Sequence, residues 1–134
     1  MTADPQMWDH EGERLVVQAV HEAIRMRYGQ IADENRSNQV GMRNRMERFR
    51  EKLRLDLAGA KTEAQARFAL VDLFSRGGNN RVLQEGWAAV LPVLRRDWRL
   101  ARDLALLALA SYAGRGTDGS ADATPDAARP ESTN

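Results

Sequence analysis

The segment Arg36–Arg54 reads RSNQVGMRNRMERFREKLR, and its pattern predicts a helix with an apolar stripe bordered by cations. Seven of its nineteen residues are basic and only two are acidic. At about 100° per residue, apolar residues spaced by three or four positions fall on one narrow stripe of a helix. The stripe runs through Met42, Met46, Phe49, Leu53 and Leu57.

Six cations border this stripe in two rows, Arg43, Arg50 and Arg54 on one flank and Arg45, Arg48 and Lys52 on the other. The helix can therefore bury its stripe in a core while the cations remain at the rim. Such a rim suits a polyanion, because each neutralised phosphate releases condensed counterions. The alternative is a solvated face whose arginine stems cover the apolar edge. The polyanion interpretation requires the six cations to be open to solvent and not paired with carboxylates of their own fold.

Length and composition indicate one domain of ordinary size, because the chain has 134 residues. It contains no cysteine, which excludes a disulfide, a thiolate metal site and a cysteine nucleophile. The longest apolar run, Leu104–Ala110, is far shorter than the roughly 20 residues that cross a bilayer. Met1–Trp8 has no apolar signal region. We therefore expect a cytoplasmic protein without a membrane partner.

Charge is unevenly distributed along the chain. Residues 1–117 hold 19 basic against 15 acidic side chains, whereas residues 118–134 hold one arginine against four acids. The formal net charge of +1 is thus an average over a basic body and an acidic tail. A basic body is compatible with nucleic acid as a partner.

Glycines and polar residues mark the ends of the first two helices. We expect the first helix over residues 8–28, with Gly29 as its stop, followed by a polar loop over residues 30–39. The basic helix then runs from about Gln39 to Leu57 and ends at Gly59.

Capping residues predict where the third and fourth helices begin. Thr62 and Gln65 have the spacing of a capping box. The third helix is apolar on nearly all sides, which predicts a central position. The fourth helix follows the turn Gly77–Asn80, with Asn80 as its N-cap, and Pro92 ends or kinks it.

The last helix is expected over residues 98–113, with Asp97 as N-cap and Gly114 as stop. Beyond it the chain lacks apolar periodicity and cannot bury enough surface to fold. No segment alternates as a strand would, so the sequence predicts a compact all-α bundle of about five helices with a disordered acidic C-terminal tail. The expected boundaries are a flexible N-terminus at 1–7, the helical bundle at 8–113 and the tail at 114–134.

Candidate catalytic groups are few. His10 and His21 lie on one face of the first helix but about 16 Å apart along its axis, too far to share a metal. Glu47 and Glu51 lie on an exposed helix where nothing raises a carboxyl pKa. Gly77-Gly78 follows a helix instead of a strand and lacks a phosphate-loop pattern. We therefore predict no catalytic, cofactor or metal site, and no small-molecule substrate.

A second basic patch, formed by Arg95, Arg96, Arg99 and Arg102, surrounds Trp98 and is partly offset by Asp97 and Asp103. We include Arg95, Arg96 and Arg99 among the candidate nucleic-acid contacts, because an aromatic ring among cations can stack on a base.

A third possibility is a helix-turn-helix made by the third and fourth helices. In that case Arg81, Gln84 and Glu85 would face bases in the major groove. Gly86 makes this a poor recognition helix.

Three segments between Met42 and Tyr112 carry a family resemblance. They are RFREKL at residues 48–53, KTEAQARF at residues 61–68 continuing through Phe74–Arg76, and DWRLARDL at residues 97–104 continuing through Ala110–Tyr112. With these segments the chain resembles the small, all-helical subunit of type I CRISPR surveillance (Cascade) complexes, or the related helical C-terminal domain of their large subunit.

The resemblance implies a non-enzymatic helical bundle within an RNA-guided complex, where guide pairing supplies sequence specificity. It implies partners among the large and backbone subunits, further copies of itself, guide RNA and target DNA. The basic helix would then contact the guide–target duplex or the displaced strand through Arg43, Arg45, Arg48, Arg50, Lys52 and Arg54. A helical protein–protein interaction module and a helix-turn-helix regulator remain as alternatives.

Overall fold

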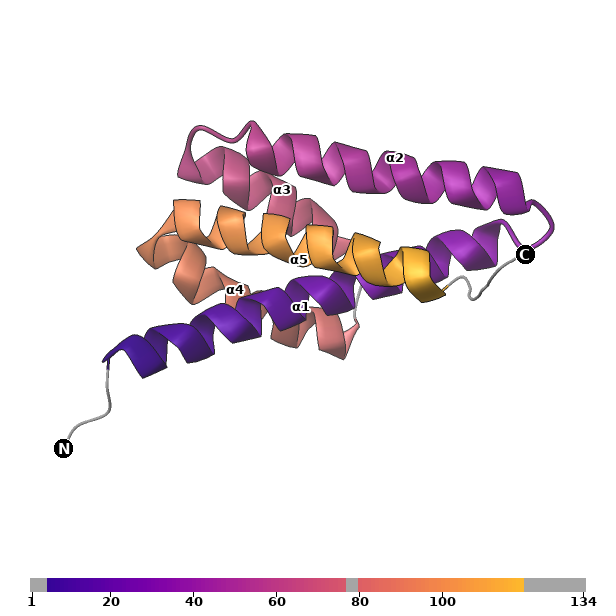
Figure 1. The fold of residues 1–134 in the computed structure, drawn as a ribbon. Helices are drawn as coiled ribbons and strands as arrows, with labels where there is room; N and C mark the ends of the chain where they lie inside the picture. Colours follow the sequence, from indigo (N-terminus) through magenta and orange to yellow (C-terminus); the bar gives the residue numbers. More distant parts are fainter. Residues whose placement is uncertain (1–4, 77–79, 120–134) are drawn as a thin grey trace.

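The computed structural model describes residues 5–76 and 80–119, with side chains for residues 11–76 and 80–112. Within these ranges every regular element is a helix, which confirms the predicted all-α bundle (Figure 1). The five helices are α1 (Pro5–Glu34), α2 (Gln39–Ala58), α3 (Glu63–Ser75), α4 (Arg81–Arg96) and α5 (Trp98–Gly119). Most of the predicted tail, residues 120–134, lies outside this description.

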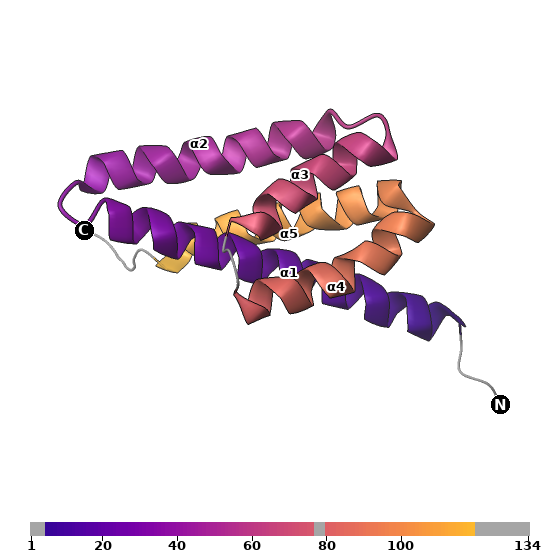
Figure 2. The same ribbon diagram turned by 180° about the vertical axis from the view of Figure 1, so that it is seen from behind.

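The helices are arranged with α2 and α4 on opposite sides of the bundle and α1, α3 and α5 between them (Figures 1 and 2). α1 packs most extensively against α4 and α5, whereas α2 contacts α1, α3 and α5. Among the described residues α2 does not approach α4. α2 therefore forms one outer face of the protein over much of its length.

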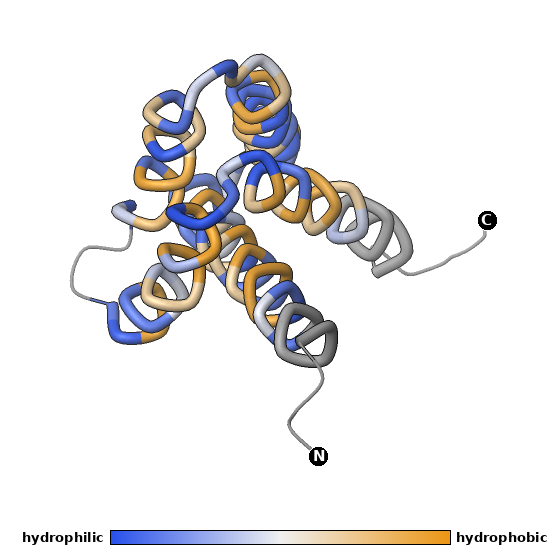
Figure 3. Tube along the Cα trace, turned by 90° about the vertical axis from the view of Figure 1, so that its left-hand side faces the viewer, coloured by the Kyte–Doolittle hydropathy of each residue, from blue (hydrophilic) through white to orange (hydrophobic). Residues whose placement is uncertain are grey.

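The core lies where these helices face one another, and the hydrophobic positions gather there (Figure 3). α5 contacts each of the other four helices and contributes small residues, with Ala101, Ala105 and Ala108 fully buried. Small side chains let neighbouring helices approach closely and still fill the space between them. The largest fully buried side chains come from the other four helices: Val16, Val20, Ile24, Leu57, Leu70, Val90 and Leu94.

α1 is longer than predicted, because the helix continues through Gly29 to Glu34. A glycine inside a helix costs about 1 kcal/mol relative to alanine. Ile31, two residues further on, is almost completely buried, and this burial offsets the cost. The side-chain amide of Asn35 then donates to the carbonyl oxygen of Ile31 at the helix end.

Three further expectations need correction. Pro92 does not end α4, because the buried Val93 and Leu94 hold the helix against the core as far as Arg96. The backbone of α5 continues past Gly114 to Gly119. α3 is not buried on all sides, since Phe68 and Val71 are 70% and 40% exposed.

The predicted capping residues are confirmed by hydrogen bonds. The side-chain oxygens of Thr62, Asn80 and Asp97 accept from backbone amides three residues later, at 3.2 Å in each case. Gly59 is the C-cap of α2, and its amide donates to the carbonyl oxygen of Leu55. No helix within the described residues is long and apolar enough to span a membrane.

Candidate nucleic-acid interface

The apolar stripe of α2 anchors the helix mainly at its C-terminal end. Leu53 and Leu57 are buried, with 6% and 0% of their surface exposed, whereas Met42, Met46 and Phe49 are only half-buried. The N-terminal half of α2 therefore lies on the bundle with less apolar contact. This arrangement leaves the side chains on both flanks accessible.

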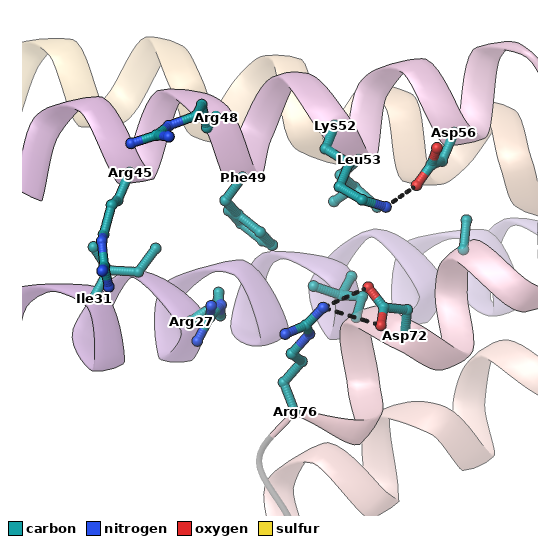
Figure 4. Close-up of a pocket in the computed structure, with 12 residues that line it drawn as sticks. Arg27, Ile31, Arg45, Arg48, Phe49, Lys52, Leu53, Asp56, Asp72 and Arg76 are labelled. Carbon is teal, nitrogen blue, oxygen red and sulfur yellow. Dashed lines mark hydrogen bonds and ion pairs between the residues drawn. The ribbon is translucent and has the colours of Figure 1, made fainter. Parts of the chain in front are cut away.

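One flank of α2 borders a hollow of about 370 Å³ between α1, α2 and α3 (Figure 4). Five cations line this basic hollow, together with only two carboxylates, those of Asp56 and Asp72. The cations are Arg27 from α1, Arg45, Arg48 and Lys52 from α2, and Arg76 from α3. The structure thus brings one predicted row of cations together with two arginines from other helices.

Both carboxylates of the basic hollow are paired with its cations. The Nζ of Lys52 lies 2.7 Å from a carboxylate oxygen of Asp56, and Arg76 Nη2 lies 3.2 Å from one of Asp72. The hydrogen bond with Asp56 raises the pKa of Lys52 above its ordinary value. The other three cations that line the hollow are Arg27, Arg45 and Arg48.

These three arginines differ in their hydrogen-bond and ion-pair partners. Arg45 lies 3.3 Å from Glu34 at the end of α1, in a pair exposed on both sides. Arg48 forms no hydrogen bond or ion pair with the described residues. Arg27 donates to Gln30, and its buried Nε has no partner in the described part of the chain. Unsatisfied donors in a positive hollow favour an anion.

On the other flank of α2, the three arginines differ in exposure and in partners. Arg54 forms an exposed pair with Glu51, at 2.6 Å, and lowers the pKa of that carboxyl. Arg50 is half-buried and lies within hydrogen-bonding reach of Tyr28 on α1. Arg43 is exposed and makes no ion pair with any described residue.

Three of the six cations of α2 thus pair with carboxylates of their own fold: Arg45, Lys52 and Arg54. Each pair is exposed, so water and salt screen it and it adds little to folding stability. A phosphate can replace such a carboxylate at little cost. The requirement for unpaired cations nevertheless fails at these three positions. It is met among the described residues by Arg43, Arg48 and Arg50, and the polyanion interpretation depends on them.

The second basic patch lies at the junction of α4 and α5. The guanidinium groups of Arg99 and Arg102 lie 4.7 and 5.4 Å from the centre of the Trp98 ring. Arg102 also donates to the carbonyl oxygen of Ala60, which links α5 to the α2–α3 loop. Cation–π contacts occupy this indole, so Trp98 is a poor platform for a base.

Of the two histidines, His21 has a structural role in the described part of the chain. The Nε2 of His21 lies 2.9 Å from the hydroxyl oxygen of Ser111, and the ring packs near Tyr112, while the His10 side chain lies outside the description. No cluster of metal ligands occurs among the described residues.

The helix-turn-helix hypothesis finds little support in the packing of α4. A Cβ on Gly86 would lie 2.8 Å from the Phe74 ring, so this side of α4 is pressed against α3 and α1. Arg81 and Gln84 are exposed, and most of the expected turn, residues 77–79, lies outside the description.

Sequence reasoning missed Arg27 and Arg76 as components of the candidate site. Both lie outside the basic run, and only the packing of α1 and α3 beside α2 brings them to it. For Arg76 the sequence does contain one indication. Arg76 follows Asp72 by four residues, about one helical turn, and this spacing favours the ion pair that the structure contains.

Comparison with known proteins agrees with the predicted resemblance. A family model described as the DevT C-terminal domain matches residues 4–134. A "CRISPR-associated protein Cas8a1/Csx13" of Myxococcus xanthus (strain DK1622) is 53% identical over 108 residues, which cover 79% of this chain and 19% of the relative. This chain thus corresponds to less than a quarter of the relative's length. No solved structure matches.

Proposed function

The chain belongs to the DevT C-terminal domain family, and from that membership we propose that it is a non-enzymatic structural component of a CRISPR RNA-guided effector complex. In this role the protein contacts the sugar-phosphate backbone of a guide–target duplex or a displaced strand. Guide pairing supplies the sequence specificity, so the protein reads backbone and shape alone. Its proposed site of action is the cytoplasm, beside large and backbone subunits and further copies of itself.

The observation that carries the proposal is the basic hollow. Five cations from three helices surround one space; three of them pair with carboxylates, two inside the hollow and Arg45 with Glu34, which leaves Arg27 and Arg48 without an ion pair among the described residues. The guanidinium groups of Arg45 and Arg48 can bind phosphate oxygens bidentately. Arg43, Arg50 and Arg54 on the other flank, and the patch of Arg95, Arg96 and Arg99, are secondary candidates.

The test is a set of charge reversals in the chain. We expect the triple variant Arg45→Glu, Arg48→Glu and Lys52→Glu to bind duplex and single-stranded oligonucleotides more weakly than the unmodified protein. The dependence of log K on log salt should flatten by about 2 for a single strand, since each lost phosphate contact removes about 0.7. Fluorescence anisotropy over a salt series measures both quantities.

The matched control reverses Arg14, Arg67 and Arg81, which are exposed on α1, α3 and α4 and do not line the hollow. Both variants change the net charge equally. An equal loss of affinity in the two variants would show that only overall charge matters and would contradict an interface at the hollow.

A protein–protein interaction module is a second candidate function, supported by exposed apolar side chains. Val40 at the start of α2 and Leu107 on α5 are 68% and 58% exposed. If this function is the main one, the chain forms a complex with effector subunits that survives nuclease treatment and assembles without RNA.

A further inference from the structure

Phe68 is the most exposed large apolar side chain in the described part of the chain, with 70% of its surface in solvent. A single exposed apolar residue is ordinary on a protein surface and needs no explanation by itself. The surroundings of Phe68 are what distinguish it. Its ring lies on α3, on the side facing the cationic row of α2.

A second, smaller hollow lies beside this ring. It measures about 350 Å³ and is lined by Lys52, Asp56, Ala64, Gln65 and Phe68, and we refer to it as the Phe68 hollow. Lys52 and Asp56 also line the basic hollow. The two hollows therefore adjoin at one ion pair, and we refer to the two together as the path between α2 and α3.

One row of residues on α3 runs along this path. Phe68, Asp72 and Arg76 are four residues apart, so they lie in one row on the helix. From Phe68 to Arg76 the row extends about 12 Å along the axis. At about 3.4 Å per nucleotide of a stacked strand, this length corresponds to roughly three nucleotides.

The net positive charge of the path is concentrated at one of its ends. Asp56 and Asp72 each pair with a cation beside them, which leaves the net positive charge at the end that holds Arg27, Arg45 and Arg48. At the other end the Phe68 hollow carries one ion pair, Lys52 with Asp56, and the apolar side chains of Ala64 and Phe68 beside Gln65. The path thus joins a cationic segment to an aromatic face.

We infer that this path binds an unpaired nucleotide segment, with one base stacked on Phe68 and the adjoining phosphates on Lys52 and the cations of the basic hollow. This inference rests on the proposed function and deepens it by specifying the strand state. Any base has a π-face that can stack on an aromatic ring without sequence preference. In a duplex both faces of each internal base are already stacked, so Phe68 gains nothing from paired nucleic acid.

The test compares Phe68→Ala with the unmodified chain on three probes: a fifteen-residue oligothymidylate, an abasic strand of equal length, and a duplex of equal length. Loss of one base stack weakens oligothymidylate binding about five- to 150-fold. We expect this loss for oligothymidylate alone, with unchanged salt dependence, and recovery in Phe68→Trp. The ring is exposed, so the variants should fold normally.

Leu107→Ala is the matched control, because it removes an exposed apolar side chain from α5, away from the path. Equal oligothymidylate affinity in Phe68→Ala and unmodified protein overturns the inference, as does an equal loss on all three probes. The proposed function fails separately, if reversing Arg45, Arg48 and Lys52 changes binding to no probe.

Discussion

The ammonium group of Lys52 lies 2.7 Å from a carboxylate oxygen of Asp56, and both side chains line the basic hollow and the Phe68 hollow. In this position Asp56 competes with a phosphate for the same cation. The pair is exposed, so it contributes little to folding stability.

Removing the competing carboxylate should strengthen polyanion binding. We expect Asp56→Asn to raise the affinity for single-stranded DNA about two- to fivefold, since one ion pair in water is worth up to about 1 kcal/mol. Isothermal titration calorimetry at constant salt measures the change. Asp33→Asn is the control, because it also removes an exposed, paired carboxylate but lies outside the hollow. A similar gain in both variants would contradict a specific role for Asp56.

The two tyrosines provide a pH-dependent readout of the packing between α1, α2 and α5. The Tyr28 ring packs edge-on against Phe49 and Tyr112, at 5.9 and 5.3 Å between ring centres. Burial raises the pKa of both tyrosines above the ordinary value of about 10. The folded protein therefore holds the phenolic protons more tightly than the unfolded chain does.

The sign of the stability effect follows from this difference. The contribution is fully present below about pH 10 and is lost as the pH rises through the raised pKa values of the folded state. We expect Tyr28→Phe to lose less stability above about pH 10 than the unmodified protein. Thermal melts at alkaline pH and the ultraviolet absorbance of tyrosinate test this. Ionisation of both tyrosines at or below their ordinary pKa would contradict the packing.

Two glycines inside helices should respond oppositely to alanine. A Cβ on Gly29 meets nothing within 4 Å, so Gly29→Ala should raise the free energy of unfolding by about 0.5–1 kcal/mol. A Cβ on Gly86 would press into Phe74 and Ala19, so Gly86→Ala should lower it by about 1–3 kcal/mol. Urea denaturation measures both. Changes of the same sign would contradict the close contact of α4 with α1 and α3.

The attachment of α2 depends on its C-terminal end. Leu57 is fully buried, so Leu57→Ala should lower the free energy of unfolding by about 2–5 kcal/mol. Leu55→Ala changes the same residue type two positions away, where the side chain is 55% exposed, and should stay within about 0.5 kcal/mol. Equal effects in denaturant titrations would mean that α2 packs through a different face.

Local sequence was sufficient for the helix count, the caps and the course of α2. Thr62, Asn80 and Asp97 cap helices where their spacing predicts, because capping involves residues only a few positions apart. Gly29 was misread because the residue that keeps α1 helical, Ile31, gains its stability from tertiary burial. No local pattern reports that burial.

The candidate site could be predicted only in part. The row Arg45, Arg48 and Lys52 follows from helical spacing, whereas Arg27 and Arg76 reach the same hollow through the packing of α1 and α3. The third helix is predicted to be central because apolar residues nearly surround it, whereas the structure exposes Phe68 on one of its sides. Which side of such a helix faces solvent depends on its neighbours, and sequence periodicity does not contain that information.

The most direct test of the interface is nuclear magnetic resonance of the chain titrated with oligothymidylate, following the arginine Nε–H signals and the backbone amides. We expect the largest shifts at Arg45, Arg48 and Arg76, with backbone changes along the facing sides of α2 and α3. Shifts concentrated instead at Arg81 and Gln84 on α4, with the hollow unchanged, would contradict binding between α1, α2 and α3.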